Sequence, residues 1–304
     1  MRFARTLCLA AAAGVGATAL TVVAFATPAQ ARVADRGASC LTPTPGPAAE
    51  ARGGSRGVDH PAISAAEQLA IARRTNSRLA AKGVAGVSER AVAGKKTVPV
   101  HFHVMRDRAG RGNVTNRQIH RQVTVLNNDY SSIGFHFNLI SIHRYKNTSW
   151  HHDRQSAQYR AKTRKGGANA LNIWLVDFQY LGIATFPWDY AKKRQIDGIR
   201  VNYDSLPGGS IANYNRGGTA THEAGHWFGL FHTFQGGCTP LNDEVNDTPA
   251  QSTPTSGCPA GRDSCPTSGM DPIHNYMDYS FDKCYTQFTG GQAARVHKMW
   301  AAYR

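Results

Sequence analysis

The most constraining feature of this 304-residue sequence is a short run that contains three histidines and one glutamate. His222 and His226 are four residues apart, and Glu223 follows the first of them. On a helix, residues four apart lie on one face, one turn from each other, so two imidazoles can share a metal ion. Gly229 lets the chain leave the helix sharply, since only glycine adopts positive φ cheaply. His232 can then turn back as a third ligand.

Three protein ligands leave the fourth position of a tetrahedral zinc ion for water, which is typical of a catalytic rather than a structural site. Glu223 is placed to act as the general base on that water. By composition alone, the whole pattern would arise by chance in roughly a few such chains in a hundred thousand. The alternative is a binding protein in which the metal only stabilises the fold, but such a site needs no base. The pairs His101/His103 and His151/His152 lack this spacing, and we interpret them as ordinary polar residues.

The first 95 residues are expected to lie outside the catalytic domain. Residues 1–31 begin with basic residues, continue with an apolar run and end on Ala29-Gln30-Ala31, which is typical of a secretory signal peptide. Residues 32–95 contain Pro/Gly-rich stretches and end among basic residues, which indicates a pro-segment removed by proteolysis. Within it, residues 65–81 are expected to form a helix with little to bury. No later stretch reaches the ~20 apolar residues of a membrane span, so the product is expected to be extracellular.

Residues 96–304 are expected to form a mixed α/β layer. Runs rich in β-branched and aromatic residues predict strands at 98–104, 135–142, 171–176, 181–186 and 199–203. Thr115 and Gln118 form a capping box ahead of a predicted amphipathic helix over 116–130. A second, polar helix is expected over 154–165, and the metal-binding helix follows the strands.

Four cysteines cluster in the C-terminal stretch, at positions 238, 258, 265 and 284. In an exported chain they are expected to form two disulfides, since the close C-x-x-C pairs of a four-thiolate zinc site are absent from the sequence. Cys40 is then the odd thiol once the signal peptide is removed. A thiolate is a strong zinc ligand, so Cys40 could fill the fourth zinc position of a latent precursor. The other interpretations are an intermolecular disulfide and an idle thiol.

The net charge is +15, which would suit association with an anionic cell wall or with nucleic acid. The sequence shows no RNA-binding signature and no basic helix with interleaved aromatic residues. We therefore interpret the charge as a solvated basic surface and expect no nucleic-acid partner.

Further motifs resemble one group of zinc enzymes. A methionine follows at position 277, 45 residues after His232, and this combination is typical of metzincins. The sequence is similar to the pappalysin/cytophagalysin family of metzincin endopeptidases over roughly residues 97–304. That similarity is carried by Thr233-Phe234, Gly236-Gly237-Cys238, Asp247-Thr248-Pro249 and Asn275-Tyr276-Met277-Asp278-Tyr279.

The resemblance implies an α+β fold: a metzincin-type zinc peptidase domain with a mixed twisted sheet, an active-site helix and a C-terminal Met-turn subdomain. Met277 would lie beneath the zinc-binding imidazoles, and Tyr279 would donate to the oxyanion of the tetrahedral intermediate. Ile183 and Ala184 would belong to an edge strand that binds the backbone of protein or peptide substrates. A zinc amidase acting on cell-wall peptides is the second enzyme alternative; the Met-turn and the edge strand favour proteins.

The resemblance also implies the disulfide pairing Cys238–Cys265 and Cys258–Cys284. Asp282 follows the Met-turn, where a carboxylate would favour Arg or Lys after the scissile bond; the alternative is a surface acid in a disulfide loop. Asp243, Asp247 and Thr248 belong to an oxygen-rich loop that suits a structural calcium ion. The sequence does not indicate the oligomeric state.

Overall fold

In this computed structural model, residues 59–60, 62–84 and 94–304 are described. The predicted signal peptide and Cys40 lie outside the described residues. The described chain contains a five-stranded sheet with the order β2-β1-β3-β5-β4. Its strands are β1 Lys96–Arg106, β2 Phe135–Lys146, β3 Leu171–Val176, β4 Gly182–Ala184 and β5 Ile199–Asn202.

The sheet is mixed, as predicted. β1 pairs in parallel with β2 and β3, and β3 pairs in parallel with β5. β4 is antiparallel to β5 and forms one edge of the sheet. Every residue of β3 is buried, as expected for a central strand that is covered on both faces. β4 is shorter than the predicted run 181–186, because Pro187 has no backbone N–H and begins a 3₁₀ turn.

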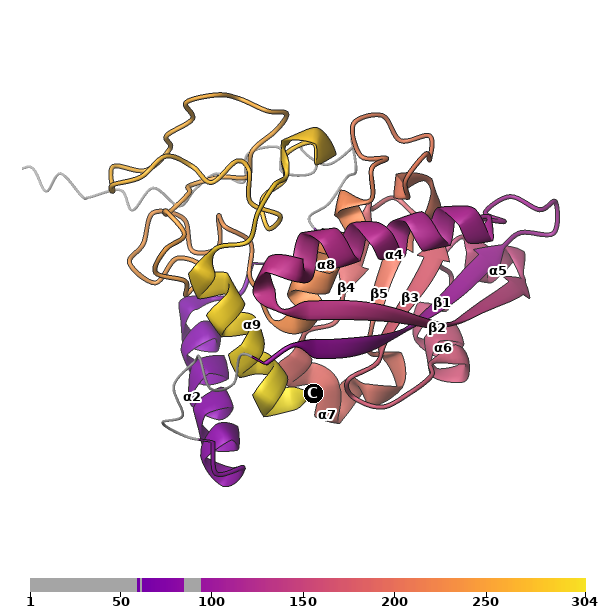
Figure 1. Cartoon of the computed structure of the whole chain (residues 1–304), viewed down its shortest axis with the longest axis horizontal. Helices are drawn as coiled ribbons and strands as arrows, with labels where there is room; N and C mark the ends of the chain where they lie inside the picture. The colour runs from indigo at the N-terminus through magenta and orange to yellow at the C-terminus, as the bar shows by residue number, and fades with distance from the viewer. Residues whose placement is uncertain (1–58, 61, 85–93) are drawn as a thin grey trace, which may run out of the picture. The chain divides into compact units, whose positions relative to one another are not determined.

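Two helices share one face of the sheet (Figure 1). These are α4 (Asn116–Tyr130) and α8 (Gly218–Phe228), and α4 has the predicted capping box. The remaining helices of the catalytic part are α5 (Thr148–His151), α6 (Ser156–Thr163), α7 (Tyr190–Lys193) and α9 (Gly290–Tyr303). The predicted helix over 154–165 is shorter in the structure, because Gln155 adopts φ 60° and the helix can begin only after it.

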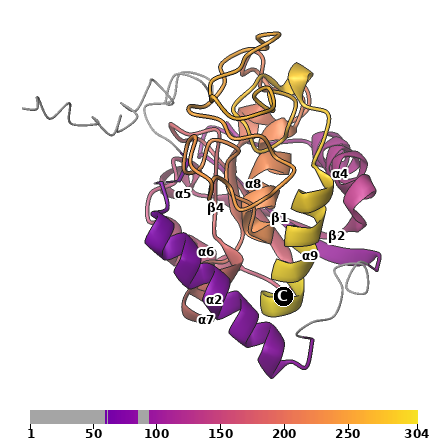
Figure 2. The same ribbon diagram turned by 90° about the vertical axis from the view of Figure 1, so that its left-hand side faces the viewer.

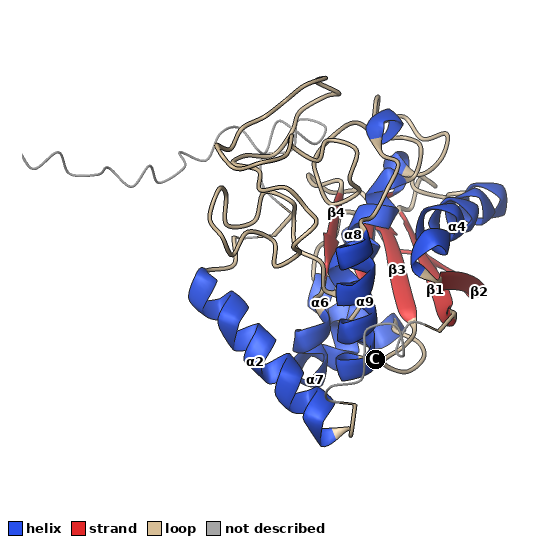
Figure 3. Cartoon of the chain, turned by 60° about the vertical axis from the view of Figure 1, so that its left-hand side comes forward, coloured by secondary structure: helices blue, strands red, loops and turns tan. Residues whose placement is uncertain are grey.

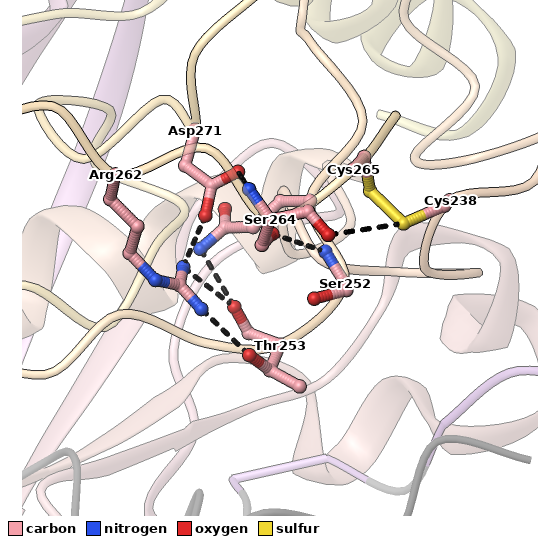
Figure 4. Close-up of a disulfide and its surroundings, with 8 residues drawn as sticks. Cys238, Ser252, Thr253, Arg262, Ser264, Cys265 and Asp271 are labelled. Carbon is pink, nitrogen blue, oxygen red and sulfur yellow. Dashed lines mark hydrogen bonds and ion pairs between the residues drawn. A yellow bond between two sulfur atoms is a disulfide. The ribbon is translucent and has the colours of Figure 1, made fainter. Parts of the chain in front are cut away.

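Residues 229–289 form a long loop region next to α8 and α9 (Figures 1 to 3). Their one helical turn is the 3₁₀ segment Asp282–Cys284. The disulfides Cys238–Cys265 and Cys258–Cys284 brace the region, with the pairing that the resemblance implies. Polar contacts replace a regular backbone ladder here: Asp271 forms an ion pair with Arg262 and accepts a hydrogen bond from Ser264 beside the first disulfide (Figure 4).

Helix α2 (Ala65–Ala81) contradicts the expectation that it has little to bury. It packs beside α9 (Figure 1), with Ile71 and Thr75 fully buried. The Thr75 hydroxyl lies 2.9 Å from the hydroxyl of Tyr303, and Lys82 donates to the Ala301 carbonyl at 2.8 Å. In the part of the chain that the structure describes, no helix is long and apolar enough to cross a membrane.

Candidate active site

The three predicted ligands converge on one point. His222 and His226 lie one turn apart on α8, and their Nε2 atoms are 3.1 Å apart. The helix ends at Gly229, which adopts φ 102°, and the chain turns back as predicted. The Nε2 atom of His232 comes to 3.1 Å from that of His226. All three imidazoles are buried.

In two of these imidazoles, a backbone carbonyl beside Nδ1 determines which ring nitrogen carries the proton. Nδ1 of His222 lies 2.7 Å from the Tyr276 carbonyl, and Nδ1 of His226 lies 2.9 Å from the Leu230 carbonyl. A carbonyl can only accept, so each Nδ1 carries the proton and each Nε2 lone pair faces the centre. Zinc–nitrogen bonds of about 2.0–2.1 Å place tetrahedral ligands about 3.3 Å apart, so the three nitrogens fit one zinc ion.

The candidate base lies directly against the edge strand. Glu223 is fully buried on α8. A Cβ atom added to Gly182, the first residue of β4, would overlap the Glu223 side chain. Glycine at position 182 therefore lets the predicted substrate-binding strand approach the carboxylate. The residues that follow it, Ile183 and Ala184, pair with β5 on one side.

The Met-turn lies beneath the metal-binding helix. Met277 is fully buried, and a Cβ atom added to Gly225 of α8 would overlap its Sδ atom. The ring of Tyr279 lies 4.9 Å from the ring of His232 and 5.7 Å from that of His222, measured between centroids. Both residues therefore lie next to the three histidines.

A carboxylate that the sequence analysis missed also lies at this site. Asp59 Oδ2 is 3.1 Å from Nε2 of His222, and Oδ1 is 3.0 Å from Nε2 of His232. The hydroxyl of Tyr279 donates to the same carboxylate. Asp59 and the three histidines form a group of potential metal ligands whose atoms all lie within 4.8 Å of one another. The sequence holds no local signal for this placement, because Asp59 is 163 residues from His222.

The next residue, His60, lies between the metal site and the edge strand. The ring of His60 is 4.7 Å from the rings of both Phe186 and His226. The backbone N–H of Ala184 donates to His60 Nε2 at 3.4 Å. Burial lowers the pKa of His60 well below its ordinary value.

Asp282 lies at the start of the metal-binding helix. Its Oδ2 atom accepts from the backbone N–H groups of Arg216, at 2.8 Å, and Gly218, at 3.3 Å. The carboxylate is buried and stabilises the N-terminal end of α8, where a negative charge is favoured. The pocket for a basic residue stays a prediction.

The predicted calcium loop packs against the start and middle of α9. Asp243 is buried, and its Oδ1 atom accepts from the Val245 N–H at 3.1 Å. Asp247 accepts from the Gly291 N–H at 2.8 Å, and Thr248 is buried nearby in sequence. Burial raises the pKa of Asp243 to about 8. A buried carboxyl of this kind is ionised readily only where a cation compensates its charge.

The chain is similar to known metallopeptidases, both in sequence and in fold. Residues 176–301 match the peptidase M43 family model, described as "Pregnancy-associated plasma protein-A". Extracellular metalloprotease 1 of Coccidioides posadasii is 49% identical over 214 residues, which cover 68% of this chain and 78% of that protein. An extracellular metalloprotease of Neurospora crassa is 44% identical over 236 residues, covering 74% and 83% of the two chains.

Two solved structures from Tannerella forsythia are also similar. Mature mirolysin in complex with a cleaved peptide has a TM-score of 0.59 and 28% identity, over 67% of this chain and 90% of that one. Promirolysin has a TM-score of 0.60 and 27% identity, over 74% and 87%. The α+β metzincin fold is confirmed by these likenesses. Together with the extracellular relatives, they establish that the chain belongs to the pappalysin family of metzincin metallopeptidases and is a secreted enzyme that hydrolyses peptide bonds.

Proposed function

We propose that the chain is a zinc-dependent endopeptidase in which His222, His226 and His232 hold one zinc ion and Glu223 is the general base. The observation that carries the proposal is the convergence of three Nε2 atoms beside a buried carboxylate at the sheet edge. Zinc, when bound, supplies a Lewis acid that acidifies a water molecule and polarises a peptide carbonyl.

The residues around the site then have separate roles in peptide hydrolysis. An extended substrate adds to the edge strand at Ile183 and Ala184, and the outward-facing N–H of Ala184 is a backbone donor for it. Glu223 accepts the proton of the attacking water and transfers it to the leaving amine. Tyr279 donates a hydrogen bond to the oxyanion, and its position beside His232 supports this role.

Two finer features belong to the same proposal. Asp282 favours Arg or Lys after the scissile bond, and its burial beside the start of α8 supports a fixed negative charge close to the metal-binding helix. Asp243, Asp247 and Thr248 bind a structural calcium ion. The buried Asp243 and the oxygen-rich sequence around it support this site.

We also propose that residues 32–95 are a pro-segment. One similar structure is, by its name, a precursor of mirolysin. Arg73, Arg74 and Arg78 lie within helix α2, whereas proteases bind extended chain. We therefore expect processing at Arg90 or Lys95, which intact mass measurement of the secreted protein would locate.

The test of the function is hydrolysis of casein by the processed enzyme, with and without a chelator. We expect cleavage that the chelator abolishes and added zinc restores. A cell-wall peptide serves as the comparison substrate, because the amidase alternative predicts cleavage of that peptide and none of casein. Casein cleavage that persists after complete removal of metal would contradict the proposal.

A further inference from the structure

We propose that residues 59–60 and 62–82 are the occupant of a docking surface across the active site, and that Asp59 is the fourth zinc ligand of the precursor. The inference rests on the proposed zinc peptidase function and adds its regulation. Two oxygens of Asp59 lie 3.1 Å and 3.0 Å from Nε2 of His222 and His232. A carboxylate is an ordinary zinc ligand, and in this position it takes the place that the catalytic water requires.

The segment blocks the substrate strand as well as the metal. The N–H of Ala184, which a bound substrate backbone would use, instead donates to His60. Tyr279, the proposed oxyanion donor, donates to Asp59. Asp59 thus takes the fourth metal position and the hydroxyl of Tyr279, and His60 takes the outward-facing N–H of Ala184.

Helix α2 attaches the segment that carries Asp59 and His60 to the catalytic domain. Ile71 belongs to a buried apolar cluster, with Ile63 and Leu79 packed against it. The catalytic domain contributes the other members: Phe186, Trp188, Phe231, Met299, Ala302 and Tyr303.

Hydrogen bonds fix the register of the docked segment. Gln68 donates to the Asn242 carbonyl at 3.0 Å, and Gln235 donates to the Ile63 carbonyl. Helix α2 begins at its N-cap Ser64, five residues after Asp59, so docking of the helix holds the carboxylate at the metal at high effective concentration. This arrangement uses an aspartate for the role that the sequence analysis assigned to Cys40.

The experiment compares three full-length precursors: the parent chain, Asp59→Ala and Cys40→Ser, each verified as uncleaved by intact mass. We expect the Asp59→Ala precursor to hydrolyse a fluorogenic peptide at least about tenfold faster than the parent. The Cys40→Ser precursor should match the parent. In a Glu223→Ala background, which prevents self-cleavage, Asp59→Ala should also release zinc to a chelator faster.

The outcomes distinguish latency through Asp59, latency through Cys40 and failure of the proposed peptidase function. A latent Asp59→Ala precursor with unchanged zinc release would overturn the inference, and an active Cys40→Ser precursor would assign latency to the thiol. If the parent stays inactive even after the pro-segment is removed, the proposed function fails instead. Ile71→Ala is a second variant that tests the same proposal. It weakens the docking of helix α2 without changing a metal ligand, so the Ile71→Ala precursor should be partially active.

A separate observation points to a second metal site, and we infer that His151, His152 and Asp177 bind a zinc ion. Nδ1 of His152 lies 3.2 Å from Asp177 Oδ2, and Nε2 of His151 lies 3.7 Å from the same oxygen. The three ligand atoms all lie within 4.8 Å of one another. These separations are close to the roughly 3.3 Å between ligands of a tetrahedral zinc ion.

The orientation of His151 supports this inference. Its side chain is fully buried, and Nδ1 lies 2.8 Å from the Met105 carbonyl. That carbonyl can only accept, so the proton is on Nδ1 and the Nε2 lone pair points towards Asp177, as in the metal-binding histidines of α8. Within the described residues, Nε2 has no hydrogen-bond partner. His152 and Asp177 are partly exposed, which leaves a path for the ion.

Zinc analysis of the full chain after incubation with zinc alone and gel filtration tests this site. We expect about two zinc ions per chain in the parent and about one in His152→Ala or Asp177→Asn. His136→Ala, which removes an exposed histidine, serves as the control and should keep two. One zinc ion in the parent, or two in both site variants, would overturn the inference.

Discussion

At the scale of single residues, the active site depends on a glycine that lets a buried side chain pack directly against the backbone of the metal-binding helix. Gly225 leaves room for the sulfur of Met277 beneath the metal-binding helix. We expect Gly225→Ala to lower the free energy of unfolding by about 1–3 kcal/mol, because the added methyl must displace a buried side chain. Denaturant unfolding with the precursor would measure this.

The matched control for this prediction is Gly225→Ala combined with Met277→Ala. Removal of the thioether makes room for the new methyl, so the two substitutions should cost less together than the sum of their separate effects. Strict additivity would mean that Met277 and Gly225 are not in contact.

Asp282 offers a second prediction at this scale. In the processed enzyme, Asp282→Asn should reduce the preference for Arg or Lys after the scissile bond, because the negative charge is lost. The amide oxygen of asparagine can still accept from Arg216 and Gly218, so α8 should keep its N-terminal contacts. Profiling of a peptide library with both enzymes checks this, and an unchanged profile would assign Asp282 to helix stabilisation alone.

At the scale of elements, the metal-binding helix is attached to its neighbours by two carboxylates, of which Asp129 is partly buried and Asp197 is fully buried. Asp129 on α4 accepts from Thr221 of α8 at 2.6 Å and from Tyr276 of the Met-turn at 3.0 Å. Asp197 accepts from Trp227 of α8 at 3.0 Å. These contacts hold the ligand-bearing helix in one orientation, as a site with preorganised ligands requires.

The loop 243–248 gives a prediction about pH. Burial raises the pKa of Asp243 to about 8 in the folded chain, whereas the pKa of an aspartate in an unfolded chain is about 3.9. Between these values the folded state holds a proton that the unfolded state releases. Asp243 therefore stabilises the fold at low pH, and this contribution is lost as the pH rises through about 8.

Calcium should change that dependence, because it binds the ionised carboxylate. We expect calcium to raise the melting temperature more at pH 8 than at pH 5, and Asp243→Asn to weaken both the calcium response and the pH slope. A variant with the same calcium response as the parent would place the ion elsewhere or exclude it.

At the scale of the whole molecule, the sequence predicted those features that depend on local spacing. The histidines lie on one helix and the turn after it, so their geometry follows from helix periodicity and Gly229. The strands and the capped helix α4 follow from short-range patterns in the same way.

The features that were missed depend on contacts between distant segments. Asp59 lies at the metal site just before helix α2, which packs on α9, and Asp282 contacts a helix start more than sixty residues away in the sequence. His151 and Asp177 are brought together by the end of β3. No local periodicity records such pairings.

The central claim is that Glu223 is the base of a zinc peptidase whose ligands are the three histidines. The most direct measurement compares zinc content and casein hydrolysis of the parent and Glu223→Ala after identical removal of the proposed pro-segment. We expect the catalytic zinc to stay bound, since all three imidazoles remain, and hydrolysis to fall by at least about 10²–10⁴-fold, the usual contribution of a positioned base. Glu223→Ala enzyme that keeps its zinc and still cleaves casein at an appreciable fraction of the parent rate would contradict the account.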